Sequence, residues 1–444
     1  MIAEPLHPIA IAVPKTRVTF AEALRFWLKL GFINFGGPAG QIAIMHRELV
    51  DEKRWISEPL FLRALNFCML LPGPEAQQLA TYVGWRLHGV PGGLIAGSLF
   101  VIPSIFVLLA LSWLAVSYGD VPVMRGLLYG IQPVVTAIVL DAVIRVGRRT
   151  LRHRLLLAFA VLAFIAIYVA HVPFPLVIAA AALGGVALQR WWPDAFRARG
   201  HGQPYDHEAN TSTASKAAPS VRSALVLLAI FLGLWAVPFV ILLAWRGSND
   251  VLTQEMLFFT QAAFITFGGA YAVLSYIADV AVNSYQWVTT PEMVRGLGLA
   301  ESTPGPLIMV TQYVGFLAAW KNAQPGVSPL LNGTLGALIT VYATFLPCFF
   351  FIFLGAPFIE LLSADRRIEA ALTGISAAVV GVIANLGVFF AVHVLFPAPG
   401  VFDWFAAIVA AGSFVTLRRF STPTYVLVPV GAVLGMAWAV LASW

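Results

Sequence analysis

The sequence has little charge and almost no cysteine. Only 11% of its 444 residues are charged, and 59% are hydrophobic. A soluble domain carries about a quarter charged residues, so the composition excludes an ordinary soluble protein. The two cysteines, Cys68 and Cys348, both lie in apolar segments, which excludes a disulfide framework and a zinc site of the usual spacing. We therefore expect an all-α polytopic membrane protein.

Sequence signatures of several chemistries are missing as well. The phosphate-binding pattern GxxxxGK[ST] does not occur, which argues against an ATP-driven pump. Two isolated cysteines cannot hold an iron–sulfur cluster, so a redox enzyme is disfavoured. We expect no enzyme activity, no cofactor and no metal. The net charge of +6 is modest and is typical of basic cytoplasmic loops, so membrane lipid is an expected partner and nucleic acid is not.

An internal repeat is what the sequence does have. Phe35-Gly36-Gly37 recurs as Phe267-Gly268-Gly269, and Pro72-Gly73-Pro74 recurs as Pro304-Gly305-Pro306, both 267 − 35 = 232 positions later. Farther along, Gly130 matches Gly374 at 374 − 130 = 244 positions, so one insertion separates the two registers. Such an ordered series of matches indicates a duplication. We expect a first repeat at 1–190, a linker at 191–222, an extra transmembrane helix at 223–246 and a second repeat at 247–444.

Loop charges indicate that the two repeats have opposite orientations. Each repeat holds about six apolar elements, and one extra helix between them turns the second repeat over. The loop at 145–154, "RVGRRTLRHR", is basic where the second repeat has "FPAPG", and "LRRF" at 417–420 is basic where the first has "HVPFP". Because cytoplasmic loops are rich in Lys and Arg, we expect inverted-topology repeats, a cytoplasmic linker and a periplasmic C-terminus. Inverted repeats with broken helices are the architecture of secondary transporters.

The Pro-Gly-Pro motifs predict broken or re-entrant helices. Pro72 and Pro74, like Pro304 and Pro306, lack the backbone donor that a helix needs. Lipid cannot satisfy the freed backbone groups, so each break must face protein, water or a ligand. A half-helix that begins after a break aims its N–H groups back into the break, which suits an anion. The alternative is that the motifs only kink helices or let them pack closely.

The candidate substrate-binding residues surround these motifs. They offer backbone donors, glycines and polar side chains, and one oxyanion site could be built from both repeats. In the first repeat they are Asn34, Gly36, Gly37, Gly73, Glu75, Ala76, Gln77 and Gln78. In the second they are Thr266, Gly268, Gly269, Thr303, Gly305, Leu307, Ile308, Thr311 and Gln312.

Three charged residues inside apolar segments are candidates for coupling or gating. Glu75 directly follows the first break, Glu301 precedes the second, and Lys29 lies in the first apolar element. An ionisable group in a membrane segment is by default a functional hypothesis. The alternative for Glu75 is a favourable place in the first turn of a helix.

The motifs and their surroundings resemble the chromate ion transporter family. "FGGPAGQIAIMHRELVDEKRWIS" and "LLPGPEAQQLATYVGWRLHG" resemble its N-terminal half, and "TFGGAYAVLSY" and "ESTPGPLIMVTQYVGFLAAW" its C-terminal half. The family's paired motifs fall on the Phe-Gly-Gly and Pro-Gly-Pro residues, whereas Ser275 stands where the family usually has proline. The resemblance implies a long, two-half member that exports chromate across a bacterial inner membrane and confers chromate resistance.

Other functions stay open at this point. The cargo could be sulfate or another anion, moved by uptake or by chromate/sulfate exchange. An anion channel is a further alternative, which saturable flux would exclude. The sequence also leaves open whether the chain forms a homodimer.

Overall fold

The computed structural model describes residues 18–196, 221–265, 267, 269–356 and 366–442. Within these ranges the chain forms helices joined by short turns, with an isolated β-bridge between Ala398 and Val401. Six of these helices are long and apolar enough to cross a membrane: Glu75–Ser117, Pro122–Thr150, Val221–Arg246, Pro329–Gly355, Arg366–Leu395 and Thr424–Leu441. The predicted all-α membrane class is confirmed.

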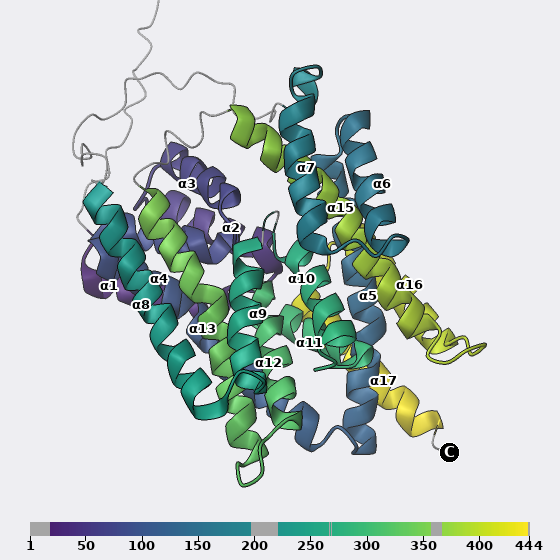
Figure 1. The fold of residues 1–444 in the computed structure, drawn as a ribbon. Coiled ribbons are helices and arrows are strands. Elements are labelled where there is room, and N and C mark those ends of the chain that lie inside the picture. Colours follow the sequence, from purple (N-terminus) through teal and green to yellow (C-terminus); the bar gives the residue numbers. More distant parts are fainter. Residues whose placement is uncertain (1–17, 197–220, 266, 268, 357–365, 443–444) are drawn as a thin grey trace, which may run out of the picture.

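The first half runs from α1 to α7 (Figure 1), and α8 follows it. Proline stands in the first turn of several of these helices, where its missing N–H costs nothing. The elements are α1 (Phe20–Ile33), α2 (Gly37–His46), the π-helical η1 (Arg47–Glu52), α3 (Glu58–Leu70), α4 (Glu75–Ser117), α5 (Pro122–Thr150), α6 (Arg154–Tyr168), α7 (Phe174–Leu188), the 3-10 turn η2 (Pro193–Ala195) and α8 (Val221–Arg246).

The second half repeats this order of elements. They are α9 (Val251–Ile265), α10 (Ala270–Asp279), the π-helical η3 (Val280–Ser284), α11 (Thr290–Ser302), the 3-10 turn η4 (Leu307–Met309), α12 (Val310–Lys321), α13 (Pro329–Gly355), α15 (Arg366–Leu395), α16 (Trp404–Phe420) and α17 (Thr424–Ala442).

One element of the first half corresponds to two of the second. Helix α4 is kinked at His88 and Gly89, which have non-helical backbone angles. Its two segments match α12 and α13, which a loop separates. This loop contains the insertion that shifts the sequence register of the repeat. The π-helical turns η1 and η3 also occupy equivalent places, and nothing in the sequence pattern predicted them.

The long helices of the two halves pack on each other's C-terminal helices. Helix α5 lies along α16 and α17, and α15 lies along α6 and α7 (Figure 1). At the α5–α17 crossing, a Cβ added to Gly130 would lie 2.1 Å from the carbonyl oxygen of Gly431. At the α15–α7 crossing, a Cβ added to Gly374 would lie 2.4 Å from the carbonyl oxygen of Ala181. The halves therefore interlock through small residues that let backbones approach closely.

The Gly130→Ala variant tests this crossing. The new methyl group would meet backbone atoms of α17, which cannot move aside as a side chain can. We expect a loss of about 1–3 kcal/mol of stability, seen as a lower midpoint of thermal unfolding of the detergent-purified protein. Gly233→Ala in α8 is the matched control, because no other atom lies within 4 Å of its added Cβ. Equal midpoints for the two variants would contradict the interlocked packing.

Candidate functional site

Both Pro-Gly-Pro motifs interrupt a helix in the same way. Helix α3 ends at Leu70, and α4 begins at Glu75 after Gly73, whose φ is +125°. Helix α11 ends at Ser302, and Gly305, with φ +116°, precedes the 3-10 turn at the start of α12. A side chain is strained at such φ values, so glycine is required at both centres. The expected half-helix starts directly after the first break and one turn later after the second.

Each break packs against the other half of the chain. A Cβ added to Gly73 would lie 2.9 Å from Sγ of Cys348, which belongs to α13. A Cβ added to Gly305 would lie 2.5 Å from Oγ of Ser104, which belongs to α4. Ser104 and Cys348 are 348 − 104 = 244 positions apart, the offset of the repeat in this region. The two contacts are therefore equivalent by the repeat.

The Phe-Gly-Gly segment of each half also meets the break of the other half. Gln41 donates through Nε2 to the carbonyl oxygens of Asn34 (2.9 Å) and Gly305 (2.6 Å). The amide of Gly305 in turn donates to the carbonyl oxygen of Asn34 at 3.4 Å. On the other side, a Cβ added to Gly269 would lie 3.7 Å from Oε1 of Glu75. The structure thus pairs the Phe-Gly-Gly segment of each half with the Pro-Gly-Pro break of the other half.

Most predicted polar side chains are fully buried around the breaks. The amide nitrogens of Asn34, Gln78 and Gln312 donate to the carbonyl oxygens of Phe100, Pro72 and Ile105, respectively. Gln77 donates to the hydroxyl of Thr81. The amide oxygens of all four side chains have no hydrogen-bond partner within the described chain. These free oxygens can accept a hydrogen bond from water, and each NH2 group has a second N–H that can serve an anion or a water molecule.

The other predicted residues lie as follows. The hydroxyls of Thr303 and Thr311 donate to the carbonyl oxygens of Ala300 and Ile308, within their own turns. Gly36 and Gly37 have φ values of +89° and +65°, so the backbone turns sharply into α2. Ala76, Leu307 and Ile308 are buried at the starts of the half-helices. Thr266 and Gly268 lie outside the described residues.

The three charged candidates have different surroundings. Glu301 is buried and accepts a hydrogen bond from the hydroxyl of Tyr271. Glu75 is partly exposed at the first break. Lys29 forms an ion pair with Glu48 of η1 at 2.6 Å, and its side chain is 57% exposed. Lys29 therefore ties α1 to the π-helical turn, whereas the two carboxylates stand beside the breaks.

Sequence reasoning missed Gln41 and Ser104, and it placed Cys348 in an apolar segment without giving it a role. Gln41 has no polar counterpart in the repeat, since Val273 stands at the equivalent position, so comparing the halves could not have found it. Ser104 and Cys348 did carry a signal. Each directly follows a proline that the repeat conserves within the chain, Pro103 and Pro347.

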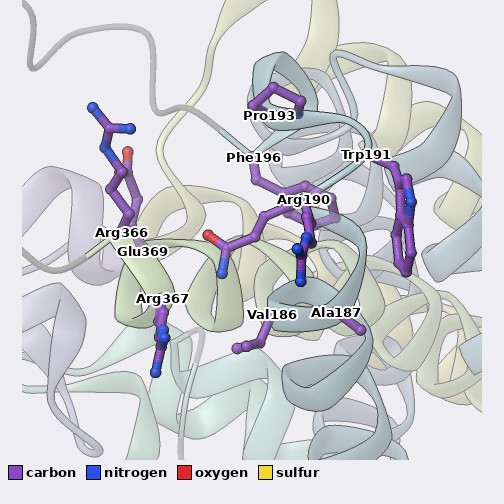
Figure 2. Close-up of a pocket in the computed structure, with 10 residues that line it drawn as sticks. Val186, Ala187, Arg190, Trp191, Pro193, Phe196, Arg366, Arg367 and Glu369 are labelled. Carbon is purple, nitrogen blue, oxygen red and sulfur yellow. The ribbon is translucent and has the colours of Figure 1, made fainter.

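A separate hollow lies between the end of α7 and the start of α15 (Figure 2). Arg190 of the α7 end and Arg366 and Arg367 of α15 line it, together with Glu369 and Trp191. Residues of the repeated motifs do not line this hollow. We therefore do not place the candidate oxyanion site there.

The chain is similar to known transport proteins. The sequence model of the Chromate transporter family matches residues 21–186 and 253–436. A chromate transport protein of Pseudomonas aeruginosa is 31% identical over 84% of this chain and 81% of its own length. A chromate transport protein of Cupriavidus metallidurans is 27% identical over 94% of this chain and 92% of its own. A probable chromate transport protein of Synechococcus elongatus is 27% identical over 82% of each chain.

No solved structure matches the chain. One family model covers both halves of the sequence, in agreement with the repeated order of elements and the repeated motifs at the breaks. The chain is therefore a multi-pass membrane protein and a member of the chromate transporter family.

Proposed function

We propose that this chain is a secondary transporter that exports chromate across the bacterial inner membrane by alternating access and so confers chromate resistance. The family and the relatives support chromate as the cargo. The observation that carries the proposal is the reciprocal contact between the halves, in which Asn34 and Gln41 meet Gly305 while Glu75 meets Gly269. A site shared by two halves is one that their relative movement can open and close.

The chemistry of this region suits a tetrahedral oxyanion. The first-turn N–H groups of Glu75, Ala76 and Gln77 are not used within α4, and a helix N-terminus favours an anion. The side-chain amides of Asn34, Gln77, Gln78 and Gln312 add adjustable hydrogen-bonding groups. Full positive charges are not needed, so the anion can leave again. In this proposal Glu75 and Glu301 act as gating charges that repel the anion or release it.

The two breaks differ in exposure, which supports alternating access. Helix α11 packs against α5, α15 and α17, whereas α3 packs mainly against α4. Both Pro-Gly-Pro triplets are buried, but Leu71 and Glu75 beside the first are partly exposed, whereas their equivalents by the repeat, Thr303 and Leu307, are buried. If the repeats are inverted, as their loop charges predict, equivalent breaks open toward opposite sides of the membrane. A structure with one break covered and the other more open is then one end state of the transport cycle.

The orientation in this proposal follows the basic loops. Arg145 to Arg154 and Arg418 to Arg419 face the cytoplasm, as does the linker, and the C-terminus is periplasmic. A dianion that leaves a cell with a negative interior gains about 4.6 kcal/mol per 100 mV, twice the value for one charge. Export therefore needs no ATP.

Flux measurements on everted membrane vesicles test the proposed function directly. We expect saturable uptake of radiolabelled chromate that depends on the protein, because the cytoplasmic side of these vesicles faces the medium. Competition by excess sulfate would show a general site for tetrahedral oxyanions. A linear, non-saturable flux would favour a channel, and uptake only into right-side-out vesicles would reverse the direction. No protein-dependent flux in either preparation would contradict chromate as the cargo.

The Gly305→Leu variant tests the site. Its side chain would meet Ser104 and force a strained φ at the second break, so we expect transport to be lost while membrane expression is retained. Gly412→Leu is the matched control, because an added Cβ in α16 has no atom within 4 Å. Wild-type flux in Gly305→Leu would contradict the placement of the site at the breaks.

A further inference from the structure

A carboxylic acid lies buried in the second half, away from both breaks. Glu255 of α9 has no exposed surface. Neither of its carboxyl oxygens has a hydrogen-bond partner within the described chain. The hydroxyl of Thr340 of α13 is buried and unpartnered as well, as is that of Thr253, which lies on another face of α9. An ionised carboxylate without donors is costly to bury, so this site holds Glu255 in its neutral, protonated form.

The carboxyl group faces the crossing of α12 and α13. A Cβ added to Gly336 of α13 would lie 2.9 Å from Oε2 of Glu255. A Cβ added to Gly315 of α12 would lie 2.1 Å from Oγ1 of Thr340 and 3.0 Å from the carbonyl oxygen of Gly336. Glu255 and Thr340 therefore flank one close contact between two helices.

The equivalent crossing in the first half, between the two segments of α4, forms without polar side chains at the positions of Glu255 and Thr340. By the offsets of the repeat, Glu255 corresponds to Ala23, Thr340 to Ala96 and Thr253 to Ala21. Ala23 and Ala96 are buried, and the crossing there packs Gly84 against Gly92 and Ala96. A purely structural role does not explain why the second half carries an acid and a hydroxyl, Glu255 and Thr340, at the two places where the first half buries alanine.

Other charges around Glu255 leave it without a counterion. Asp250, just before α9, brings a second negative charge to the region. Arg246 of α8 lies 3.9 Å from Asp250 and donates through Nη2 to Asn332 of α13 at 3.0 Å, while its Nε and Nη1 have no hydrogen-bond partner within the described chain. Lys321 at the end of α12 pairs with Glu292 of α11 at 2.6 Å. Because Arg246 and Lys321 pair with Asp250 and Glu292, and neither forms an ion pair with Glu255 within the described chain, a bound proton is what neutralises Glu255.

We propose that Glu255 is the proton-binding site that couples chromate export to proton entry. The inference rests on the proposed transport function. Gly315 lies eight residues after Leu307, about 12 Å along a helical path, so a change of charge at Glu255 acts on the half-helix that lines the second break. Gaining or losing a proton changes the packing of α9 on α12 and α13, and this favours one end state over the other. Among the described residues, no group of three His, Cys, Asp or Glu residues could hold a metal ion, and the helices here are unbroken, which favours a proton over a metal cation.

The test uses the full-length protein in liposomes that contain a pH-sensitive dye. With the membrane potential clamped at zero, an acidic lumen should drive chromate inward while the lumen becomes alkaline. In Glu255→Gln, which mimics the protonated acid, we expect the proton signal and the pH-driven chromate uptake to fall to the level of protein-free liposomes. Chromate/chromate exchange, which needs no net proton movement, should remain measurable and shows that the variant is folded.

Two further variants keep the test decisive. Glu22→Gln removes an exposed carboxylate of α1 and gives the residue that the second half has at the equivalent position, Gln254, so it should keep both signals. The double variant Glu255→Ala/Thr340→Ala copies the composition of the first half, and we expect it to fold and to lose the coupling.

The outcomes separate this inference from the proposed function. Wild-type chromate flux without proton movement, or normal coupling in Glu255→Gln, would overturn the proton site and leave chromate transport standing. Uptake driven by a sodium gradient and lost in Glu255→Gln would replace the proton by a metal cation and equally overturn the inference. A wild-type protein that carries no chromate under a membrane potential would overturn the proposed function itself.

Discussion

Every part of this structure depends on the need to satisfy backbone groups where lipid cannot. Two helices are broken inside the apolar part of the chain, and unpaired backbone groups there cost several kcal/mol each. The second break is served by the first half, because Gln41 donates to the Gly305 carbonyl oxygen and the Gly305 amide donates to that of Asn34. The first break is served within its own half, where Gln78 donates to the Pro72 carbonyl oxygen. The chain can keep its broken helices because buried groups beside each break take up freed backbone groups.

The same constraint explains why long helices of one half pack on helices of the other half at the periphery. Helix α5 packs on α17, and α15 packs on α7, at crossings where glycine and alanine stand in place of larger side chains. Such crossings gain close packing without a hydrophobic driving force, since lipid is as apolar as the helix surface. The two halves are joined along two equivalent helix crossings, α5 on α17 and α15 on α7. In the proposed transport cycle, the halves move along these crossings and close the two breaks unequally.

Much of this architecture could be predicted from sequence because it leaves a periodic signal. Hydropathy located the long helices, and the recurrence of Pro72-Gly73-Pro74 as Pro304-Gly305-Pro306 located the breaks. The partners of the breaks could not be predicted, because contacts such as Gln41 with Gly305 join residues far apart in the chain. Lys29 illustrates the same limit: its pairing with Glu48 depends on the π-helical turn, which has no sequence pattern that we recognised. Glu255 was overlooked because it lies in a segment without a motif. Its significance becomes visible only in the structure, where its counterpart Ala23 is buried equally well.

The exchanged helices also impose an order on biosynthesis. Gly130 meets Gly431, and 431 − 130 = 301 residues of chain must be made between them. At about 5–20 residues per second, the ribosome needs roughly 15–60 seconds to supply α17 after α5 has left it. During that interval the glycine face of α5 has only lipid, or the insertion machinery, as a neighbour. Until α17 arrives, the unfinished molecule leaves this face of α5 bare, and quality control in the cell has that interval in which to recognise it.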